Sequence, residues 1–240
     1  MKPESVKKLN RVAILQSSYI PWKGYFDLIR QADTFILFDD VQYTRRDWRN
    51  RNRIKTAQGL KWLTIPVSVK GKFHQKIKDT IVSEPGWANK HWESLHHAYR
   101  QAPFFEKYSD FIQKLYREVS SLSYLSEINY LFITEINRLL KIDSIIRWSS
   151  EFTLQDGKNE RLLGICRDVG ATTYISGPSA RSYLDEELFH NNGVAVKWMN
   201  YTGYPEYPQL YEPFEHHVSI LDLLFNTGDK AIDYIKVSGN

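Results

Sequence analysis

The stretch VAILQSSYIPWKGYFDLIRQADTFILFDD, residues 12–40, decides the fold class of this chain. An apolar run, 12–15, is followed by a polar and aromatic loop, 16–25, and by a helix-like segment, 26–32. A second apolar run, 34–38, ends in two adjacent acids. Short apolar runs that alternate with helical patterns are typical of parallel strands joined by helices. We therefore expect an α/β fold with a layered, mainly parallel, Rossmann-like sheet.

The pattern outside this stretch is consistent with one α/β domain over residues 11–240, preceded by a flexible tail, 1–10. A strand bent at Pro66 is expected over 62–69. Apolar residues recur at spacings of three or four over 87–140, which predicts helices there. These helices would form either a small subdomain over the ligand crevice or a plain structural layer.

Charge and cysteine content narrow the class of protein. The net charge is +4, and six basic residues crowd into positions 45–55. A local cluster of this kind favours a phosphorylated small molecule and argues against nucleic acid, which is usually bound by a broader basic face. The single cysteine, Cys166, excludes an intrachain disulfide and a multi-cysteine metal site. Without a signal peptide or an apolar run long enough to span a bilayer, a cytoplasmic protein is expected.

Three residues are candidates for catalysis. Asp39 and Asp40 end the second apolar run, and neighbouring residues of a strand point to opposite faces, so the two carboxylates are expected to have different roles. One could act as a general base, and the alternative is a structural pair bridged to an arginine. His91 is a further candidate base, the alternative being a surface histidine. No metal site is predicted, because His91 and His96 are five residues apart, whereas two ligands on a helix favour a spacing of four.

Substrate-binding residues are expected in three segments. The loop after the first strand resembles the position at which α/β folds bring a turn close to phosphates. The basic segment alternates arginine with asparagine, so that an extended strand would place arginines on one face. A Ser-Gly-Pro-Ser turn precedes a helical segment at 180–188 and would hold an anion. The candidates in these segments are Gln16, Tyr19, Trp22, Gly24, Tyr25, Asn50, Arg51, Asn52, Arg53, Ser176, Gly177, Ser179 and Arg181.

The same segments carry a resemblance to a known family. AILQSSYIPWKGYFDLI, FDDVQY, RDWRNRNRIK, WLTIPV, NKHWESLHHAYRQAPFF and RLLGICRDVGATTYISGPSARSYLDEELF are similar to motifs of the WbqC-like protein family. The resemblance covers the chain from about residue 11 to about residue 228, although Ser17 stands where many members have proline. It implies a role in the biosynthesis of bacterial surface polysaccharides such as O-antigen.

Together these observations favour an enzyme that acylates or aminoacylates the amino group of a nucleotide-linked sugar. No cofactor is implied beyond an activated acyl or aminoacyl donor. Two alternatives stay open: an ATP-dependent ligase or nucleotidyltransferase with Mg²⁺ at Asp39 or Asp40, and a non-catalytic binding protein of the polysaccharide pathway. The sequence does not fix the oligomeric state, and a homodimer is one option.

Overall fold

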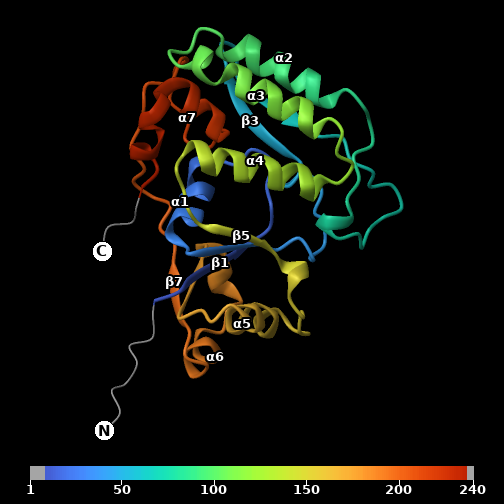
Figure 1. Ribbon diagram of the computed structural model, residues 1–240, viewed down its shortest axis with the longest axis vertical. Helices are drawn as coiled ribbons and strands as arrows, with labels where there is room; N and C mark the ends of the chain where they lie inside the picture. Colours follow the sequence, from blue (N-terminus) through green and yellow to red (C-terminus); the bar gives the residue numbers. More distant parts are fainter. Residues whose placement is uncertain (1–8, 237–240) are drawn as a thin grey trace.

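The structure is a computed structural model that describes residues 9–236. Five parallel strands form the central sheet in the order β5-β2-β1-β6-β7 (Figure 1). Their bounds are Arg11–Leu15 (β1), Thr34–Leu37 (β2), Ile145–Trp148 (β5), Thr173–Ser176 (β6) and Ala195–Trp198 (β7). The chain moves outward from β1 to β2 and β5, and then returns to the other side of β1 for β6 and β7. This reversal is the strand order of a doubly wound α/β fold, so the expected fold class is confirmed.

Alternation along the strands divides the core into two parts. Ala13, Phe35 and Ile175 face a large cluster of helices, whereas Val12 and Tyr174 face a smaller one. Successive strand residues point to opposite sides of a sheet, which is why short runs of apolar residues can serve both faces. The helices of the smaller side are Lys158–Asp168 (α5) and Glu186–Asn191 (α6), below the sheet in Figure 1.

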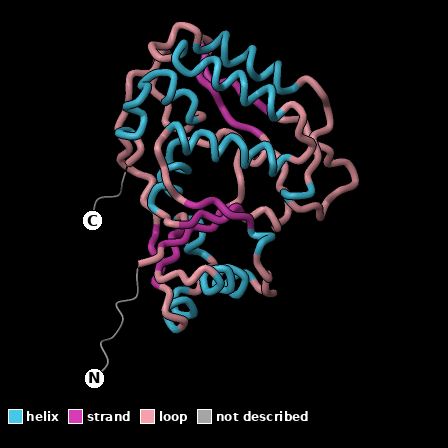
Figure 2. Tube along the Cα trace, in the orientation of Figure 1, coloured by secondary structure: helices cyan, strands magenta, loops and turns pink. Residues whose placement is uncertain are grey.

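The larger side holds the remaining helices. Their bounds are Lys23–Gln31 (α1), Trp87–Tyr99 (α2), Phe105–Val119 (α3), Leu125–Leu139 (α4) and Ile220–Thr227 (α7). Figure 2 shows that helices dominate the region above the sheet. The helical prediction for 87–140 is therefore confirmed, and buried residues of α2, α3 and α4 belong to the same apolar cluster as α1. That cluster is continuous with the sheet face, which is what a structural layer requires.

A two-stranded antiparallel hairpin packs against α2 through β3. It consists of Arg51–Thr56 (β3) and Gly59–Thr64 (β4). The strand expected over 62–69 was placed too late in the sequence: β4 ends at Thr64, and Val67 forms only an isolated bridge with Val82. The strand begins directly after the turn at residues 57–58, because pairing with the basic strand β3 sets its register.

Two further expectations concern the ends of the chain and membranes. Residues 1–8 of the predicted tail lie outside the described residues, while Asn10 donates its side-chain amide to the Val169 carbonyl at 2.7 Å. Within residues 9–236, none of the helices has the length and apolar character needed to cross a bilayer.

Candidate functional site

Two cavities lie where the strand order reverses, between the carboxyl ends of β1 and β6. The first has a volume of about 350 Å³ and the second of about 310 Å³. They share Leu15, Gly177 and Ser179, so that they adjoin across the turn after β6. Open α/β sheets bind ligands at this topological position, which makes the two cavities the candidate site.

The first cavity is walled by aromatic rings and a few polar groups. Its rings come from widely separated segments, the loop before α1, the segment before β3 and the connection before α7. The lining residues are Leu15, Ser18, Pro21, Trp22, Tyr25, Trp48, Arg49, Asn52, Gly177, Ser179, Tyr201 and His217. An apolar, concave wall with a few directed polar groups is what a small-molecule site requires.

The loop between β1 and α1 forms the floor of this cavity and is held firmly. Asn52 donates its side-chain amide to the carbonyls of Tyr19 and Ile20 at 3.1 and 2.8 Å. The Ser17 amide donates to the buried Asp39 carboxylate at 2.8 Å. Ile20 has a φ of 35°, a strained conformation for a β-branched residue that persists only where surrounding contacts impose it. The loop is therefore preorganised.

Arg49 provides the positive charge of the first cavity. This residue is only 9% exposed, and its Nε and Nη1 atoms have no hydrogen-bond partner among residues 9–236. The nearest carboxylate oxygen, Asp47 Oδ2, is 3.9 Å from Nε, too far for a hydrogen bond. Guanidinium donors that are buried without hydrogen-bond partners are costly, so Arg49 favours binding of an anion in this cavity.

A long connection between β7 and α7, residues 199–218, closes the cavity on the opposite side, and we call it the strap. Tyr201 and His217 of the strap line the cavity. Lys23 Nζ donates to the Pro205 carbonyl at 2.8 Å and lies 5.0 Å from the centre of the Tyr207 ring. Burial lowers the pKa of this lysine to about 8. One buried cation thus anchors the strap to the first turn of α1.

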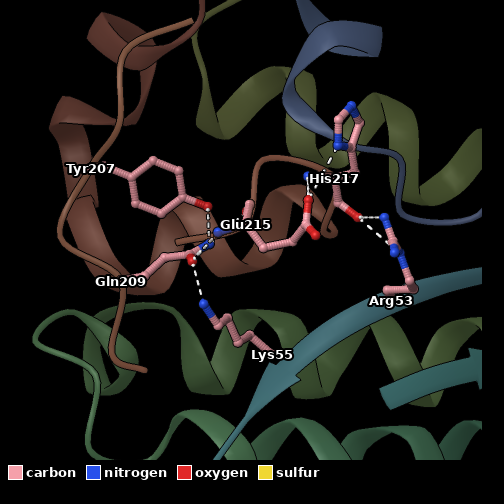
Figure 3. Close-up of polar contacts among 6 residues, drawn as sticks. All are labelled: Arg53, Lys55, Tyr207, Gln209, Glu215 and His217. Atoms are coloured by element: carbon pink, nitrogen blue, oxygen red, sulfur yellow. Dashed lines mark hydrogen bonds and ion pairs between the residues drawn. The ribbon is translucent and has the colours of Figure 1, made fainter. Parts of the chain in front are cut away.

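The end of the strap is fixed by polar contacts (Figure 3). Arg53 donates twice to the His217 carbonyl, at 3.2 and 2.9 Å, and Lys55 donates to Gln209 Oε1 at 3.0 Å. His217 Nδ1 lies 3.2 Å from Glu215 Oε1. Burial raises the pKa of Glu215, but hydrogen bonds from the His217 amide and ring outweigh it and hold this pKa below its ordinary value. The imidazole is therefore oriented by an ionised carboxylate.

The second cavity combines an apolar floor with cations and hydroxyls. Lys158 and Arg161, from the first turns of α5, line it together with Ser176 and Ser179. Its lining also includes Ile14, Gln16, Leu28, Phe38, Val41, Leu162, Tyr174, Ala180 and Tyr183. This lining is suited to a ligand with an apolar body and an anionic group.

Seven of the predicted binding residues come together around these cavities. They are Gln16, Trp22, Tyr25, Asn52, Ser176, Gly177 and Ser179. Gly24 serves the site indirectly, because a Cβ atom there would lie 2.3 Å from the Trp22 ring. Replacing this glycine would therefore displace a cavity wall.

The other predicted binding residues line neither cavity. Tyr19 is fully buried, with its hydroxyl 2.8 Å from His91 Nδ1, and Asn50 donates to the Ile65 carbonyl. Arg51 stacks on Trp62, Arg53 holds the strap, and Arg181 lies over the Trp198 ring. These placements are consistent with supporting roles.

The predicted catalytic residues lie outside the cavity linings, and their catalytic roles stay predictions. Burial raises the pKa of Asp39, which accepts hydrogen bonds from Ser17 and from Ser126. Burial also raises the pKa of Asp40, but hydrogen bonds from Lys78 and Ser149, with the nearby lysine charges, lower it overall. The two acids thus have different environments, and the cations that pair with Asp40 are Lys76 and Lys78 in place of the expected arginine.

His91 occupies a buried polar network. Its Nε2 lies 3.2 Å from the Thr64 carbonyl, and burial lowers its pKa to about 4. It is therefore neutral near pH 7. In the described part of the chain, no group of three His, Cys, Asp or Glu side chains could hold a metal ion.

Sequence reasoning missed seven residues of the first cavity. Three belong to or adjoin the predicted loop, Leu15, Ser18 and Pro21, and the other four are Trp48, Arg49, Tyr201 and His217. Arg49 belongs to the basic segment, but the expected alternation did not distinguish it from Arg51 and Arg53. Tyr201 and His217 lie far along the chain in a segment without periodicity. The density of Tyr and Pro in 201–213 was the available signal, because such segments often line binding surfaces.

Comparisons with known proteins place nearly the whole chain in one family. The model of the WbqC-like protein family matches residues 16–234, which include every residue of the first cavity except Leu15. The "Uncharacterized protein Rv1507c" of Mycobacterium tuberculosis (strain ATCC 25618 / H37Rv) is 50% identical over 228 residues, which cover 95% of this chain and 98% of that protein. No solved structure matches the chain. The chain belongs to the WbqC-like protein family.

Proposed function

We propose that this protein is a transferase that acylates or aminoacylates the amino group of a nucleotide-linked sugar in the first cavity. The observation that carries the proposal is the buried Arg49 side chain, which lines an aromatic-walled cavity and has two guanidinium donors without a hydrogen-bond partner among residues 9–236. Guanidinium groups bind phosphate oxygens through paired, charge-assisted hydrogen bonds. Trp22, Tyr25 and Tyr201 supply ring surfaces for a sugar.

His217 is the best-placed proton acceptor for this reaction. With its Nδ1–H donating to Glu215, the Nε2 atom is left to accept a proton. The sugar amine attacks the donor carbonyl, a C–N bond forms, and the amine proton passes to His217. The bond from the carbonyl carbon to the thiol or alcohol leaving group then breaks, and His217 returns the proton to that group. No net oxidation or additional reactant is needed.

The second cavity would hold the activated donor. It adjoins the first cavity at Gly177 and Ser179, so a donor carbonyl placed there would reach the sugar amine. Lys158 and Arg161 would bind the anionic part of the donor. A product of this kind would serve the assembly of bacterial surface polysaccharide.

The test compares two variants with a matched control. Arg49→Gln should weaken binding of a uridine- or thymidine-diphosphate amino sugar by about tenfold or more, since hydrogen bonds to charged groups contribute about 1.5–3 kcal/mol. Arg46→Gln, which removes a neighbouring exposed arginine, should bind as the wild type does. Calorimetric titration measures both affinities, and equal affinity for Arg49→Gln and wild type would remove the phosphate role of Arg49.

Turnover gives the second readout. His217→Gln should keep the affinity for the sugar nucleotide and lower kcat by about 10²–10⁴-fold, the usual contribution of general acid–base catalysis. Mass spectrometry of the sugar nucleotide, incubated with candidate acyl and aminoacyl donors, detects the amide. Undiminished turnover by His217→Gln would exclude this histidine as the base.

A further inference from the structure

The outer face of the β3–β4 hairpin carries a surface of exposed tryptophans and stacked arginines. Arg53 is the cross-strand partner of Trp62, and Arg51 lies two residues away on the same face. The rings of Trp62 and Trp48 are 5.4 Å apart, and these residues are 42% and 39% exposed. We call Trp48, Trp62, Arg51 and Arg53 the hairpin platform.

The platform is positively charged, and its two arginines form no ion pair within residues 9–236. The Arg51 guanidinium lies 4.1 Å from the centre of the Trp62 ring, and the Arg53 guanidinium lies 5.6 Å from Trp48 and 5.7 Å from Trp62. Within the described chain, neither arginine has a carboxylate at ion-pair distance. The segment from Arg45 to Lys61 contains seven basic residues and one acid, Asp47. An exposed pair of tryptophan rings in this positive electrostatic potential favours a flat, aromatic ligand that bears negative charge.

The platform is continuous with the first cavity. Trp48 belongs to both, and the next residue is Arg49, whose side chain also lines the cavity. A ligand with phosphate at Arg49 therefore has its next chemical group beside Trp48. In a nucleotide-linked sugar, the sugar lies on one side of the diphosphate and the nucleobase lies on the other. The geometry thus separates two ends of one molecule, with the sugar inside and the base outside.

We propose that the hairpin platform binds the nucleobase of the nucleotide-linked substrate, by stacking on Trp62 and Trp48. The proposal rests on the proposed function for the placement of the diphosphate at Arg49. Stacking on a tryptophan is tolerant of base identity, since every base has a flat π-face. The platform therefore selects nucleotides over simple sugar phosphates.

The experiment compares uridine diphosphate with inorganic pyrophosphate, which shares the diphosphate and lacks the nucleoside. Calorimetric titrations use the wild type, Trp62→Leu, Trp62→Phe and Leu60→Ala. Leu60 is 43% exposed on the same strand face and is the matched control. We expect Trp62→Leu to raise the Kd of uridine diphosphate about tenfold or more, Trp62→Phe to recover part of the loss, and Leu60→Ala to change nothing. The Kd of pyrophosphate should be the same in all four proteins.

Two results would contradict binding of the nucleobase to the hairpin platform. One is an unchanged Kd of uridine diphosphate in Trp62→Leu, and the other is an equal loss of affinity for pyrophosphate. If the nucleotide sugar still binds the wild type and Arg49→Gln weakens that binding, the proposed function still holds although the nucleobase proposal fails. If Arg49→Gln also leaves binding unchanged, the proposed function fails as well, so the two failures are distinguishable.

Discussion

At the scale of single residues, burial decides which titratable groups can take part in chemistry near pH 7. His91 and His217 have the same side chain, but His91 contacts Tyr19 and Thr64 in the interior, whereas His217 lines a cavity beside Glu215. Desolvation keeps the first imidazole neutral over the physiological range. A sequence motif cannot separate these two environments.

His91 predicts a specific loss of stability in acid. Its pKa is lowered by burial to about 4 in the folded protein, whereas the unfolded chain has the ordinary value of about 6.5. Between these values the unfolded state binds a proton that the folded state does not, so the free energy of unfolding falls as pH falls through this range. At pH 5 the free energy of unfolding should therefore be about 2 kcal/mol lower than at neutral pH.

Urea denaturation at pH 7.5 and pH 5 measures this difference. Between pH 7.5 and pH 5, the free energy of unfolding of His91→Gln should fall by about 2 kcal/mol less than that of the wild type. His97→Gln, a change at an exposed histidine of the same helix, should behave as the wild type does. Parallel pH dependence in His91→Gln and wild type would show that His91 is not the group responsible.

At the scale of elements, the strap is irregular and yet has a defined position because buried polar groups hold it. The Tyr207 hydroxyl donates to the buried Asp222 carboxylate at 2.6 Å, and the Tyr204 hydroxyl donates to Asp27 at 2.5 Å. Each buried carboxylate needs these donors, because an unsatisfied charge in the interior is expensive. The strap and the helices therefore stabilise each other.

Tyr207→Phe should loosen the strap. The change removes one of the donors to Asp222, and losing one such hydrogen bond should destabilise the protein by about 1–3 kcal/mol. Amide hydrogen exchange over 200–218 should accelerate, and affinity for ligands of the first cavity should fall, since Tyr201 and His217 belong to the strap. Tyr234→Phe is the control, because the Tyr234 hydroxyl has no hydrogen bond within residues 9–236. Unchanged exchange over the strap in Tyr207→Phe would contradict this account.

At the scale of the whole molecule, the first cavity joins parts of the chain that are separated in sequence. Its lining extends from Leu15 to His217 and includes the sheet, the loop before α1, the hairpin and the strap. A ligand that contacts all of them stabilises the native state against global unfolding. Binding should therefore appear as a change in melting temperature of the entire protein.

A sugar nucleotide at about one hundred times its Kd should raise the free energy of unfolding by about 2.7 kcal/mol. For a chain of 240 residues this corresponds to a rise in Tm of about 5–10 °C. Differential scanning calorimetry measures the shift, and uridine without phosphate should produce a much smaller one. The absence of a shift with every sugar nucleotide tested, at concentrations that saturate in calorimetric titration, would contradict binding to the native state.

The sequence by itself determined the layered, mainly parallel sheet and the helices over 87–140, because hydrophobic periodicity is local and the two faces of a strand alternate residue by residue. It also indicated the crevice beyond β1 and β6, with Gln16, Trp22, Asn52 and Ser179 near it. Only the tertiary structure decided that Arg49 lines the first cavity together with His217, whereas Arg51 and Arg53 do not. Which side chains line the cavity depends on contacts between residues far apart in the chain. The desolvation that follows from such contacts is a property of the packed molecule.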